Sequence, residues 1–400
     1  MKKTPKGLRL HIAILGRRNV GKSSLLNHLT SQYVSIVSSH PGTTTDPVEK
    51  PMELLPIGPV LFIDTAGLDD TGELGALRIE KTIKIFDRAD IILLIAEAWA
   101  WTDFEEGVLK QAGERNTPIL VVLNKIDIRE VNQNLTGKLK KRGIPYLEVS
   151  CLDKTWEVTS RVKAEIINIL PVDWINPLPI ISDLITKNNL VVLVIPIDKE
   201  APKGRLILPQ QQTIREILDK KADCLITDEK KLSSALNNLK KKPKVVVTDS
   251  QVFKEVFKAV PFNILVTSFS ILFARSKGDL QEFIKGAAAL DDLNPGDKVL
   301  VAEACTHHPI GDDIGRIKIP NWITQRTGHK INFDVYSGHD FPPDLSKYKL
   351  IIHCGSCMLN RKETLSRIYQ AKSQKIPITN YGIAIAHLHQ NLKRALEVFS

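Results

Sequence analysis

LHIAILGRRNVGKS, residues 10–23, is the stretch that decides the fold of the first part of this 400-residue chain. Its first six residues predict a buried strand, and the next eight match the pattern G-x-x-x-x-G-K-[S/T] ahead of a predicted helix. Gly16 and Gly21 let backbone N–H groups approach phosphate oxygens, and the helix N-terminus adds its dipole. Lys22 would reach the β- and γ-phosphates, and the Ser23 hydroxyl would bind Mg²⁺. The stretch therefore predicts a P-loop nucleotide-binding domain.

Three later strand ends carry the remaining groups of a nucleotide site. The strand over 60–63 ends in the acidic Asp64, and Gly67 follows where a γ-phosphate could be sensed. Another apolar run ends in Asn124-Lys125-Ile126-Asp127, and the Asp127 carboxylate can accept hydrogen bonds from both N1 and N2 of guanine. Adenine lacks that donor pair, so Asp127 favours GTP over ATP. The order resembles the GTPase superfamily over residues 8–170. The predicted GTP-binding residues are Gly16, Asn19, Gly21, Lys22, Ser23, Ser24, Asn124, Lys125, Asp127, Ser150 and Cys151.

The segment Pro41-Gly42-Thr43-Thr44-Thr45-Asp46 resembles the first switch of the TrmE/Era-like GTPases. By that resemblance Thr44 is the threonine that senses Mg²⁺, with Thr43 and Thr45 as alternatives. The expected Mg²⁺ ligands are Ser23, Thr44 and Asp64, and the expected catalytic residues are Lys22, Thr44, Asp64 and Gly67.

The residues near the phosphates also suggest how hydrolysis proceeds. Leu68 stands where Ras-like enzymes carry a water-positioning glutamine, so that side chain is absent. Asn19 matches the asparagine that holds K⁺ in related potassium-dependent GTPases, where the cation neutralises charge as an arginine finger does. We therefore expect slow GTP hydrolysis that K⁺ stimulates. Glu73 lies about one residue from the position of a water-orienting glutamate, and its role stays open.

Composition limits the class of protein. A hydrophobic content of 43% and a charged content of 25% are ordinary for a globular protein. Apolar runs are too short for a membrane span, and the basic N-terminus has no signal core, so we expect a cytoplasmic protein without a membrane partner. The net charge of +10 permits RNA binding, but no aromatic residues are interleaved with the lysine clusters, so nucleic acid is not the favoured partner.

The middle of the chain predicts a small parallel α/β sheet. Three prolines between Pro171 and Pro179 indicate a linker, after which strands and helices alternate to about residue 267. The lone Cys224 falls inside a predicted strand and is interpreted as a core residue. Since the region holds no site motif, we expect it to mediate homodimerisation, by joining two sheets edge to edge.

The last 120 residues concentrate thiols and imidazoles after predicted strands. One strand runs into Cys305-Thr306-His307-His308, another into His339-Asp340, and a third into His353-Cys354-Gly355-Ser356-Cys357. Open α/β sheets bind ligands at the carboxyl ends of their strands. A helix over 312–326 is expected to break at Pro320. His308 and His339 are interpreted as loop residues.

Three clustered cysteines leave two metal interpretations open. Zinc would accept Cys305, Cys354, Cys357 and His307 or His353 in a closed tetrahedral site. A [4Fe–4S] cluster would take the three thiolates and leave one iron for a histidine, Asp340, water or an external ligand. Spacing alone does not decide between these metals.

The combination of these three regions resembles the HydF family of iron–iron hydrogenase maturation GTPases over essentially the whole chain. Cys305-x-His307 and His353-Cys354-x-x-Cys357 match the cluster motif of that family. The resemblance implies a [4Fe–4S] cluster on Cys305, Cys354 and Cys357. His307, His353 and Asp340 are the candidates for the variable fourth ligand. The resemblance to this family also implies a scaffold or carrier protein for the two-iron subcluster of the hydrogenase. Such a protein works with two radical-SAM maturases and delivers the subcluster to the FeFe-hydrogenase.

The predicted protein is thus an α/β chain of three domains. These are a GTP-binding domain at 1–171, a dimerisation domain at 178–276 and an iron–sulfur domain at 279–400. The expected cofactors are a [4Fe–4S] cluster, Mg²⁺ and K⁺, with GTP as substrate, and the expected assembly is a homodimer or higher oligomer. The alternative function is an RNA- or ribosome-associated TrmE/Era-like GTPase with a structural zinc.

Overall fold

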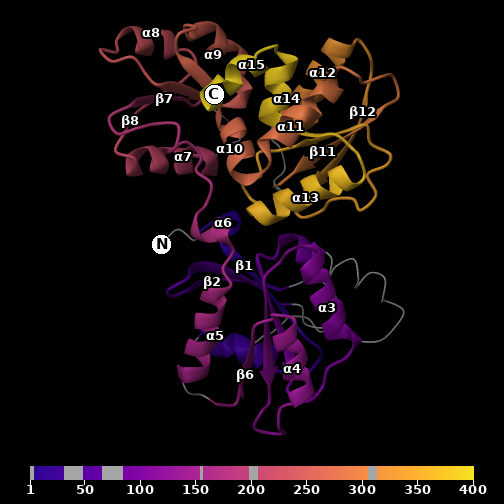
Figure 1. The fold of residues 1–400 in the computed structure, drawn as a ribbon. Coiled ribbons are helices and arrows are strands. Elements are labelled where there is room, and N and C mark those ends of the chain that lie inside the picture. The colour runs from indigo at the N-terminus through magenta and orange to yellow at the C-terminus, as the bar shows by residue number, and fades with distance from the viewer. Residues whose placement is uncertain (1–3, 31–47, 65–83, 154–155, 198–205, 305–312) are drawn as a thin grey trace. The chain divides into compact units, whose positions relative to one another are not determined.

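The computed structural model of the protein describes residues 4–30, 48–64, 84–153, 156–197, 206–304 and 313–400 (Figure 1). The chain forms two compact units, Met1–Pro177 and Leu178–Ser400. Parallel strands alternate with helices in both units, which confirms the predicted α/β class. Among the described helices, none combines the length and the apolar character needed to cross a membrane.

The first unit is built on a six-stranded sheet of order β2-β3-β1-β4-β5-β6, in which only β2 runs antiparallel to its neighbour. Its strands are β1 (Leu10–Leu15), β2 (Val48–Leu54), β3 (Gly58–Asp64), β4 (Ile91–Glu97), β5 (Ile119–Asn124) and β6 (Tyr146–Glu148). Its helices are η1 (Lys6–Leu8), α1 (Lys22–Thr30), α3 (Asp103–Glu114), α4 (Gln133–Lys141), α5 (Trp156–Asn168) and α6 (Val172–Ile175). After β1 the chain forms β2 and β3 on one side of β1, and it then crosses to β4 on the other side. The loop after β1 therefore lies at a topological switch point.

The strand β1 is buried throughout, because both of its faces are covered. Leu10, Ile12 and Ile14 belong to one buried cluster, while Ala13 and Leu15 belong to another. Such two-sided burial is typical of parallel sheets between helical layers. It fixes the direction in which the chain enters the P-loop.

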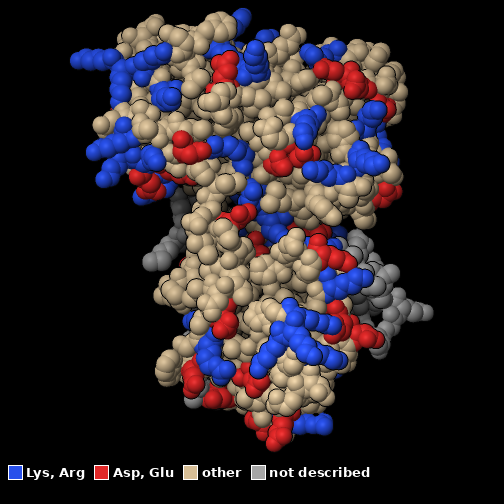
Figure 2. Space-filling model, in the orientation of Figure 1, with Lys and Arg blue, Asp and Glu red and all other residues tan. Residues whose placement is uncertain are grey.

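The second unit begins with a four-stranded parallel sheet of order β10-β9-β7-β8. Its strands are β7 (Leu190–Val194), β8 (Asp223–Thr227), β9 (Val245–Thr248) and β10 (Leu265–Ser268). Its helices are α7 (Leu208–Asp219), α8 (Leu232–Asn237), η2 (Ser250–Val252), α9 (Phe253–Ala259) and α10 (Phe269–Lys277). Cys224 is half-buried in β8 and packs against the apolar core, as expected. Basic side chains gather over α8 and the turns beside β8 (Figure 2).

The second unit continues with another four-stranded parallel sheet, of order β12-β11-β13-β14. Its strands are β11 (Lys298–Glu303), β12 (Asn332–Ser337), β13 (Leu350–His353) and β14 (Ile378–Asn380). Its helical elements are α11 (Leu280–Ala287), η3 (Ala288–Leu290), η4 (Ile314–Lys318), α12 (Ile319–Thr327), α13 (Arg361–Ser373), α14 (Tyr381–Leu388), α15 (Leu392–Leu396) and η5 (Glu397–Phe399). Because the strands are parallel and adjacent, the segments after β11, β12 and β13 leave the sheet at the same edge.

The helix expected around Pro320 differs from its prediction. Its first described turn, η4, is π-helical and is capped by the Asp313 side chain, which accepts from Arg316 N. The α-helix then starts at Ile319, so Pro320 lies in its first turn. Proline has no backbone N–H, and the first turn of an α-helix needs no such donor, so α12 continues past Pro320 without a break.

Helix α10 connects the two sheets of the second unit. It follows β10 directly and packs against α11, α13 and α14 of the other sheet. The Asn380 side chain at the end of β14 donates to Ser270 O over 2.9 Å. Gly382 lies so close that a Cβ there would come within 2.7 Å of Ser270 Cβ. One apolar cluster contains buried residues of both sheets. The division of residues 178–400 into two domains stays a prediction.

Candidate functional site

The loop between β1 and α1 has the backbone that a phosphate-binding loop requires. Gly16 has φ +155° and Gly21 has φ +103°. A Cβ at Gly16 would lie 2.3 Å from Ile95 O, and one at Gly21 would lie 2.2 Å from Asn124 Nδ2. Only glycine suits these two positions, since both the conformation and the space exclude a side chain. Asn19 also has a positive φ, of 64°, which asparagine tolerates better than most residues.

Lys22 is the first residue of α1 and crosses back over this loop. Its Nζ atom donates hydrogen bonds to Gly16 O at 2.6 Å and to Arg17 O at 2.8 Å. The side chain is 9% exposed. The ammonium group therefore lies beside the loop that the motif assigns to the phosphates.

The predicted Mg²⁺ ligands are described in part. Ser23 and Ser24 are exposed at the start of α1. Asp64 is buried at the end of β3, and it pairs with Ile14 of the adjacent parallel strand β1. Ser23 and Asp64 therefore both lie near the carboxyl edge of the sheet. The remaining predicted switch residues lie outside the described part of the chain: Thr43, Thr44, Thr45, Gly67 and Glu73.

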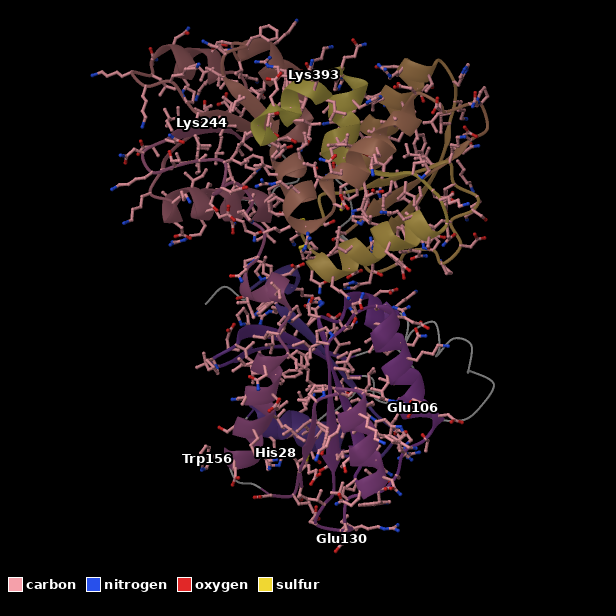
Figure 3. The ribbon with its side chains drawn as sticks, viewed as in Figure 1. His28, Glu106, Glu130, Trp156, Lys244 and Lys393 are labelled. Carbon is pink, nitrogen blue, oxygen red and sulfur yellow. The ribbon has the colours of Figure 1, made fainter. Side chains whose placement is uncertain are left out.

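Asn124 joins three loops of the nucleotide site. Its Nδ2 donates to Val20 O at 2.7 Å, and its Oδ1 accepts from Cys151 N at 2.9 Å. Burial, and secondarily the charge of nearby Asp127, raise the pKa of the Cys151 thiol to about 12. His28 Nε2 lies 2.6 Å from Cys151 O (Figure 3). The structure thus brings the exposed Asp127 and the 150–151 loop together beside the P-loop.

Glu97 connects the base-binding and phosphate-binding loops. It lies at the end of β4, where its carboxylate is 2.7 Å from Lys125 Nζ and 4.0 Å from Arg17. The Arg17 guanidinium also pairs with the fully buried Glu105 at 2.7 Å. Lys125 itself has φ +68°. These charges hold the two loops in a fixed relation, and the sequence analysis did not assign Glu97, Arg17 or Glu105 a role.

The C-x-x-C turn follows β13 directly. The Cys354 backbone N–H donates to Ala302 O at 2.9 Å, which continues the pairing between β13 and β11. The Cys354 Sγ atom accepts from the N–H groups of Ala304 at 3.0 Å and Ser356 at 3.5 Å. Ser356 has φ +56°, and this tight bend brings Cys357 back toward Cys354. Backbone N–H groups aimed at sulfur stabilise a thiolate, which is the form that binds metals.

The two cysteines are protonated at neutral pH when no metal is present. Burial, and secondarily the charge of Cys357, raise the pKa of Cys354 to about 11. Burial also raises the pKa of Cys357, while the positive charge of Lys277 acts against that rise. Binding of a metal must therefore release protons from this turn.

His353 is fully buried, and both of its ring nitrogens have polar neighbours. Nδ1 lies 2.9 Å from Cys354 O, and Nε2 lies 3.2 Å from a guanidinium nitrogen of Arg367. A neutral ring with the proton on Nδ1 satisfies both contacts. Burial, and then the charge of Arg367, lower the pKa of His353 to about 3. Coordination of iron by either nitrogen would break one of these hydrogen bonds.

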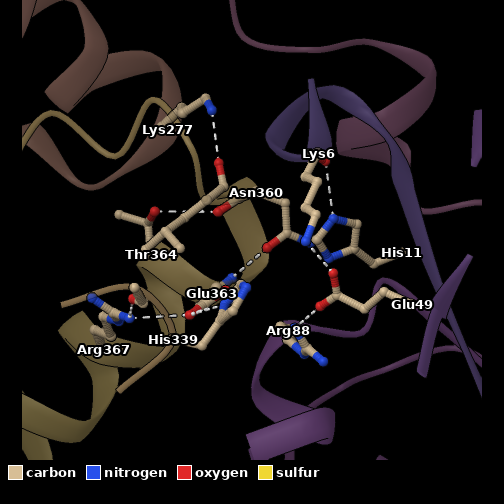
Figure 4. Close-up of polar contacts among 12 residues, drawn as sticks. Lys6, His11, Glu49, Arg88, Lys277, His339, Asn360, Glu363, Thr364 and Arg367 are labelled. Atoms are coloured by element: carbon tan, nitrogen blue, oxygen red, sulfur yellow. Dashed lines mark hydrogen bonds and ion pairs between the residues drawn. The ribbon is translucent and has the colours of Figure 1, made fainter. Parts of the chain in front are cut away.

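A buried ion pair between Arg367 and Glu363 connects α13 with His339 in the loop after β12 (Figure 4). Arg367 donates to Gly338 O at 2.6 Å and to the Glu363 carboxylate at 3.1 Å. Glu363 in turn lies 3.0 Å from His339 Nδ1. Arg367 and Glu363 are 3% and 4% exposed, whereas His339 and its neighbour Asp340 are exposed. The loop that carries Asp340 is thus connected to the C-x-x-C turn.

Lys277, at the end of α10, reaches the same turn. Its Nζ atom donates to Leu359 O at 2.7 Å and to Ser356 O at 3.1 Å. Burial lowers the pKa of Lys277 to about 8, while the charges of Cys357 and Cys354 act in the opposite direction. No pattern near Lys277 in the sequence could have assigned it, because the contact spans about 80 residues.

Two of the predicted metal-site residues, Cys305 and His307, lie outside the described part of the chain, as does His308, which was interpreted as a loop residue. Ala304, the residue before Cys305, is hydrogen-bonded to Cys354 Sγ, so the chain enters the undescribed segment beside the C-x-x-C turn. The described residues alone contain no group of three histidine, cysteine or carboxylate side chains placed to hold a metal ion. The donor chemistry of the turn nevertheless fits a cluster, since two thiols share it with N–H groups directed at sulfur.

The first unit is a P-loop GTPase domain, and its sequence matches the profile described as 50S ribosome-binding GTPase over residues 11–125. The class is therefore a GTP hydrolase with a second α/β unit. The second unit matches two further profiles, the hydrogen maturase F dimerization domain over residues 180–278 and the hydrogen maturase F tetramerization domain over residues 281–398. Together these two matches cover more than half of the 400 residues. The chain belongs to the hydrogen maturase F family and carries domains for homodimeric or higher assembly.

Two curated relatives each match about a third of this chain. The tRNA modification GTPase MnmE of Prochlorococcus marinus (strain NATL1A) is 46% identical over 121 residues, which are 30% of this chain and 26% of that protein. The GTPase Der of Wolinella succinogenes is 36% identical over 143 residues, or 35% of this chain and 30% of that protein. The chain thus spans about a quarter to a third of the length of these relatives.

Solved structures match with low similarity. A structure of Era in complex with MgGDPNP and a segment of 16S ribosomal RNA has 22% identity and a TM-score of 0.34, covering 54% of this chain and 92% of that one. The G domain of the T. maritima FeoB iron transporter has 22% identity and a TM-score of 0.31, covering 40% of this chain and 98% of that one.

Proposed function

We propose that this protein is a GTP-controlled iron–sulfur scaffold that carries the two-iron subcluster of FeFe-hydrogenase during its maturation. The observation that carries the proposal is the C-x-x-C turn, where Cys354 Sγ accepts two backbone N–H groups at the edge of a sheet in a hydrogen maturase F domain. A structural zinc site would be closed by four protein ligands. A carrier needs an open position, and three cysteines leave one on a four-iron cluster.

In the proposed cluster site, Cys354, Cys357 and Cys305 supply the thiolates. A [4Fe–4S] cluster bound there would supply one iron without a cysteine, open to a fourth ligand or to cargo. His307 and Asp340 are two candidates for that ligand. His353 stays a candidate, but its ligation would cost its hydrogen bond to Cys354 O or to Arg367.

In the proposed nucleotide site, Lys22 neutralises the β- and γ-phosphates while Ser23, Thr44 and Asp64 hold Mg²⁺. Gly67 senses the γ-phosphate, and Asp127 with the 150–151 loop selects guanine. Asn19 would hold K⁺ against the phosphates, so GTP hydrolysis should be faster in K⁺ than in Na⁺ buffer. Equal rates in the two buffers would exclude that role of Asn19.

Dimerisation is proposed to use the edge strand β8. This strand lies at one end of its sheet, and its pattern of exposed and half-buried residues leaves Ile226 47% exposed. Unpaired backbone groups on such an edge can pair with a second copy of the chain. Substitution of Ile226 by proline should give monomers in light scattering, and an unchanged oligomer would exclude this edge.

The proposed partners are two radical-SAM maturases and the hydrogenase. Bound GTP would order the switch segments and so change which partner surface is offered. Pull-downs of the hydrogenase and the maturases, with GTP and with GDP, test this coupling. Equal recovery of every partner with both nucleotides would contradict a GTP switch.

Metal content separates the proposal from a GTPase with a structural zinc. Anaerobically reconstituted protein should be brown, contain about four iron and four sulfide ions per chain as the three-cysteine cluster requires, and show an EPR signal after reduction. Stoichiometric zinc in colourless protein made under iron-replete anaerobic conditions would overturn the scaffold proposal. RNA binding at physiological salt would then favour a ribosome-associated role.

A further inference from the structure

Lys277 lies at the junction of the two hydrogen maturase F domains. It is the last residue of α10, a helix that starts at the end of β10, and it falls inside the match to the dimerization domain. Its side chain is 8% exposed. Its Nζ atom donates to carbonyl oxygens of Leu359, Ser356 and Cys357, at 2.7, 3.1 and 3.5 Å. All three belong to the C-x-x-C turn and the residues that follow it.

The contact is reciprocal. Arg361, the first residue of α13, donates to Ser276 O and to Gly278 O, both at 3.0 Å. Each segment thus places one cation against the backbone carbonyls of the other, Lys277 on the turn and Arg361 on the end of α10. Gly278 itself packs against α11, since a Cβ there would lie 2.5 Å from the ring of Phe283.

The ammonium group of Lys277 reaches beyond its own helix. A basic residue at a helix end commonly donates to the last carbonyls of its own helix, yet the three acceptors above lie outside α10. Burial of an ammonium group costs free energy unless negative charge lies close by. The two cysteines supply that charge once they become thiolates, so the ammonium and the ligated turn stabilise each other.

We propose that Lys277 is a positioning residue of the cluster site, holding the C-x-x-C turn through its carbonyl groups and offsetting the negative charge of the ligated thiolates. The inference rests on the proposed cluster. It also means that a side chain from the dimerization domain completes a site in the tetramerization domain, so the two domains act as one unit in binding the cluster.

Three variants of the 400-residue chain distinguish the effect of the hydrogen bonds of Lys277 from the effect of its charge. Lys277→Gln keeps a hydrogen-bond donor without the charge, and Lys277→Met removes both. Lys285→Met is the matched control, because Lys285 is an exposed lysine of α11 paired with Glu282 at 2.9 Å. The readouts are iron content after anaerobic reconstitution, the reduced fraction of the cluster at a fixed applied potential, and the rate of cysteine alkylation in metal-free protein.

Loss of the positive charge should favour the oxidised cluster. We expect Lys277→Gln to bind iron as the wild type does but to show a tenfold lower ratio of reduced to oxidised cluster, about 59 mV for a one-electron couple. Lys277→Met should in addition lose at least about half of the bound iron, on the order of the loss expected when a ligand loop is released, and its turn cysteines should be alkylated faster. Lys285→Met should match the wild type.

Each result bears on one proposal or the other. If Lys277→Gln has the wild-type reduced fraction and Lys277→Met the wild-type alkylation rate, Lys277 has no role in the site. If the wild type itself binds no cluster, the proposed function fails, while the alkylation rates still decide whether Lys277 holds the turn. If Lys277→Met does not fold, the reduced fraction of the cluster in Lys277→Gln decides whether Lys277 acts on the site.

Discussion

The nucleotide site and the C-x-x-C site both lie where parallel strands end, but their parts come from different distances along the chain. The P-loop takes its shape from residues within one motif, through the backbone of Gly16 and Gly21 and the inward turn of Lys22. The C-x-x-C turn depends on Ala304, about 50 residues before it, and on Lys277, about 80 residues before it. A phosphate site can be encoded locally, whereas this thiol site needs the assembled fold.

The difference is explained by the ligands proposed for the two sites. Phosphate groups keep their charge in water and need N–H groups and one lysine, which a glycine-rich loop and a helix N-terminus provide. Thiols in a buried turn must lose protons before they bind metal, and burial opposes this, as the raised pKa of Cys354 shows. N–H groups and a cation from elsewhere in the fold compensate for that opposition. Long-range contacts are therefore a chemical requirement of the second site.

The largest effect is expected from Cys357→Ser, which should abolish iron binding without changing GTP hydrolysis. Cys357→Ser removes one thiolate, and a serine hydroxyl is a far weaker iron ligand at neutral pH. We expect reconstituted iron to fall to the background level of the metal-free protein, while GTP hydrolysis stays within about twofold of the wild-type rate, as for changes remote from a site. Iron assay, visible absorbance and phosphate release measure these quantities.

Cys224→Ser is the matched control for Cys357→Ser. Cys224 is half-buried in β8, and burial raises its pKa to about 11, so it has the character of a small core residue. Full iron content in Cys357→Ser, or equal iron loss in Cys224→Ser, would contradict the assignment of the turn.

Asp127→Ala should have the opposite effect, weakening GTP binding without changing the cluster content. Guanine would lose two hydrogen bonds to a charged acceptor, each contributing about 1.5–3 kcal/mol. The Kd for GTP should therefore rise by about 100-fold or more, since about 1.4 kcal/mol corresponds to tenfold. Titration calorimetry measures the affinity, and the cluster content should not change.

Glu130→Gln provides the comparison for Asp127→Ala. Glu130 is exposed three positions further along the same loop (Figure 3), and its loss should leave the Kd unchanged. A rise in Kd below about threefold for Asp127→Ala, less than one charged hydrogen bond should give, would mean that guanine is selected elsewhere.

Arg367→Met tests whether the buried charges around the C-x-x-C turn stabilise the second unit. Removal of the guanidinium leaves the Glu363 carboxylate buried beside His339 and takes a donor from His353. Loss of one partner of a buried pair costs about 3–5 kcal/mol. Because the second unit would be less stable, the backbone amides of β13 should exchange their hydrogens faster. The affinity for GTP should not change.

Lys372→Met is the control on the same helix. Lys372 is 58% exposed and lies 3.5 Å from Glu282, so its loss should cost less than about 0.5 kcal/mol. Similar exchange rates in the two variants would show that the Arg367–Glu363 pair adds no stability.

The sequence predicted those parts of the molecule whose determinants are contiguous. The strand–loop–helix at 10–30, the base-binding residues Asn124 and Asp127, and the alternation of strands and helices in the second unit follow from local pattern. The predictions from the sequence were incomplete where a residue's environment depends on contacts between distant parts of the chain. His353 was named from its place beside Cys354, but its buried hydrogen bond to Arg367 depends on how α13 packs. Pro320 was expected to break a helix, yet it lies in a first turn because a π-helical segment precedes it.

The smallest expected effect concerns an ion pair of the first unit that involves neither site. The Glu49 carboxylate on β2 lies 2.5 Å from both Lys6 Nζ and Arg88. Burial alone would raise its pKa, but the hydrogen bonds and charges of Lys6 and Arg88 outweigh burial and lower the pKa of Glu49 to about 2. A lowered pKa in the folded state means that Glu49 stabilises the fold above its ordinary value of 4.5 and loses that contribution as pH falls from 4.5 toward 2.

Because Lys6 is half-exposed, the contribution is about 1–2 kcal/mol rather than the full value of the shift. Glu49→Gln should therefore lower the free energy of unfolding by that amount at pH 7, and the difference from the wild type should shrink below pH 4.5 and vanish near pH 2. Tryptophan fluorescence during urea denaturation follows this unit, since Trp99, Trp101, Trp156 and Trp174 are four of the five tryptophans. A difference between the two proteins that is independent of pH would mean that Glu49 stabilises the unit by packing and not by its charge.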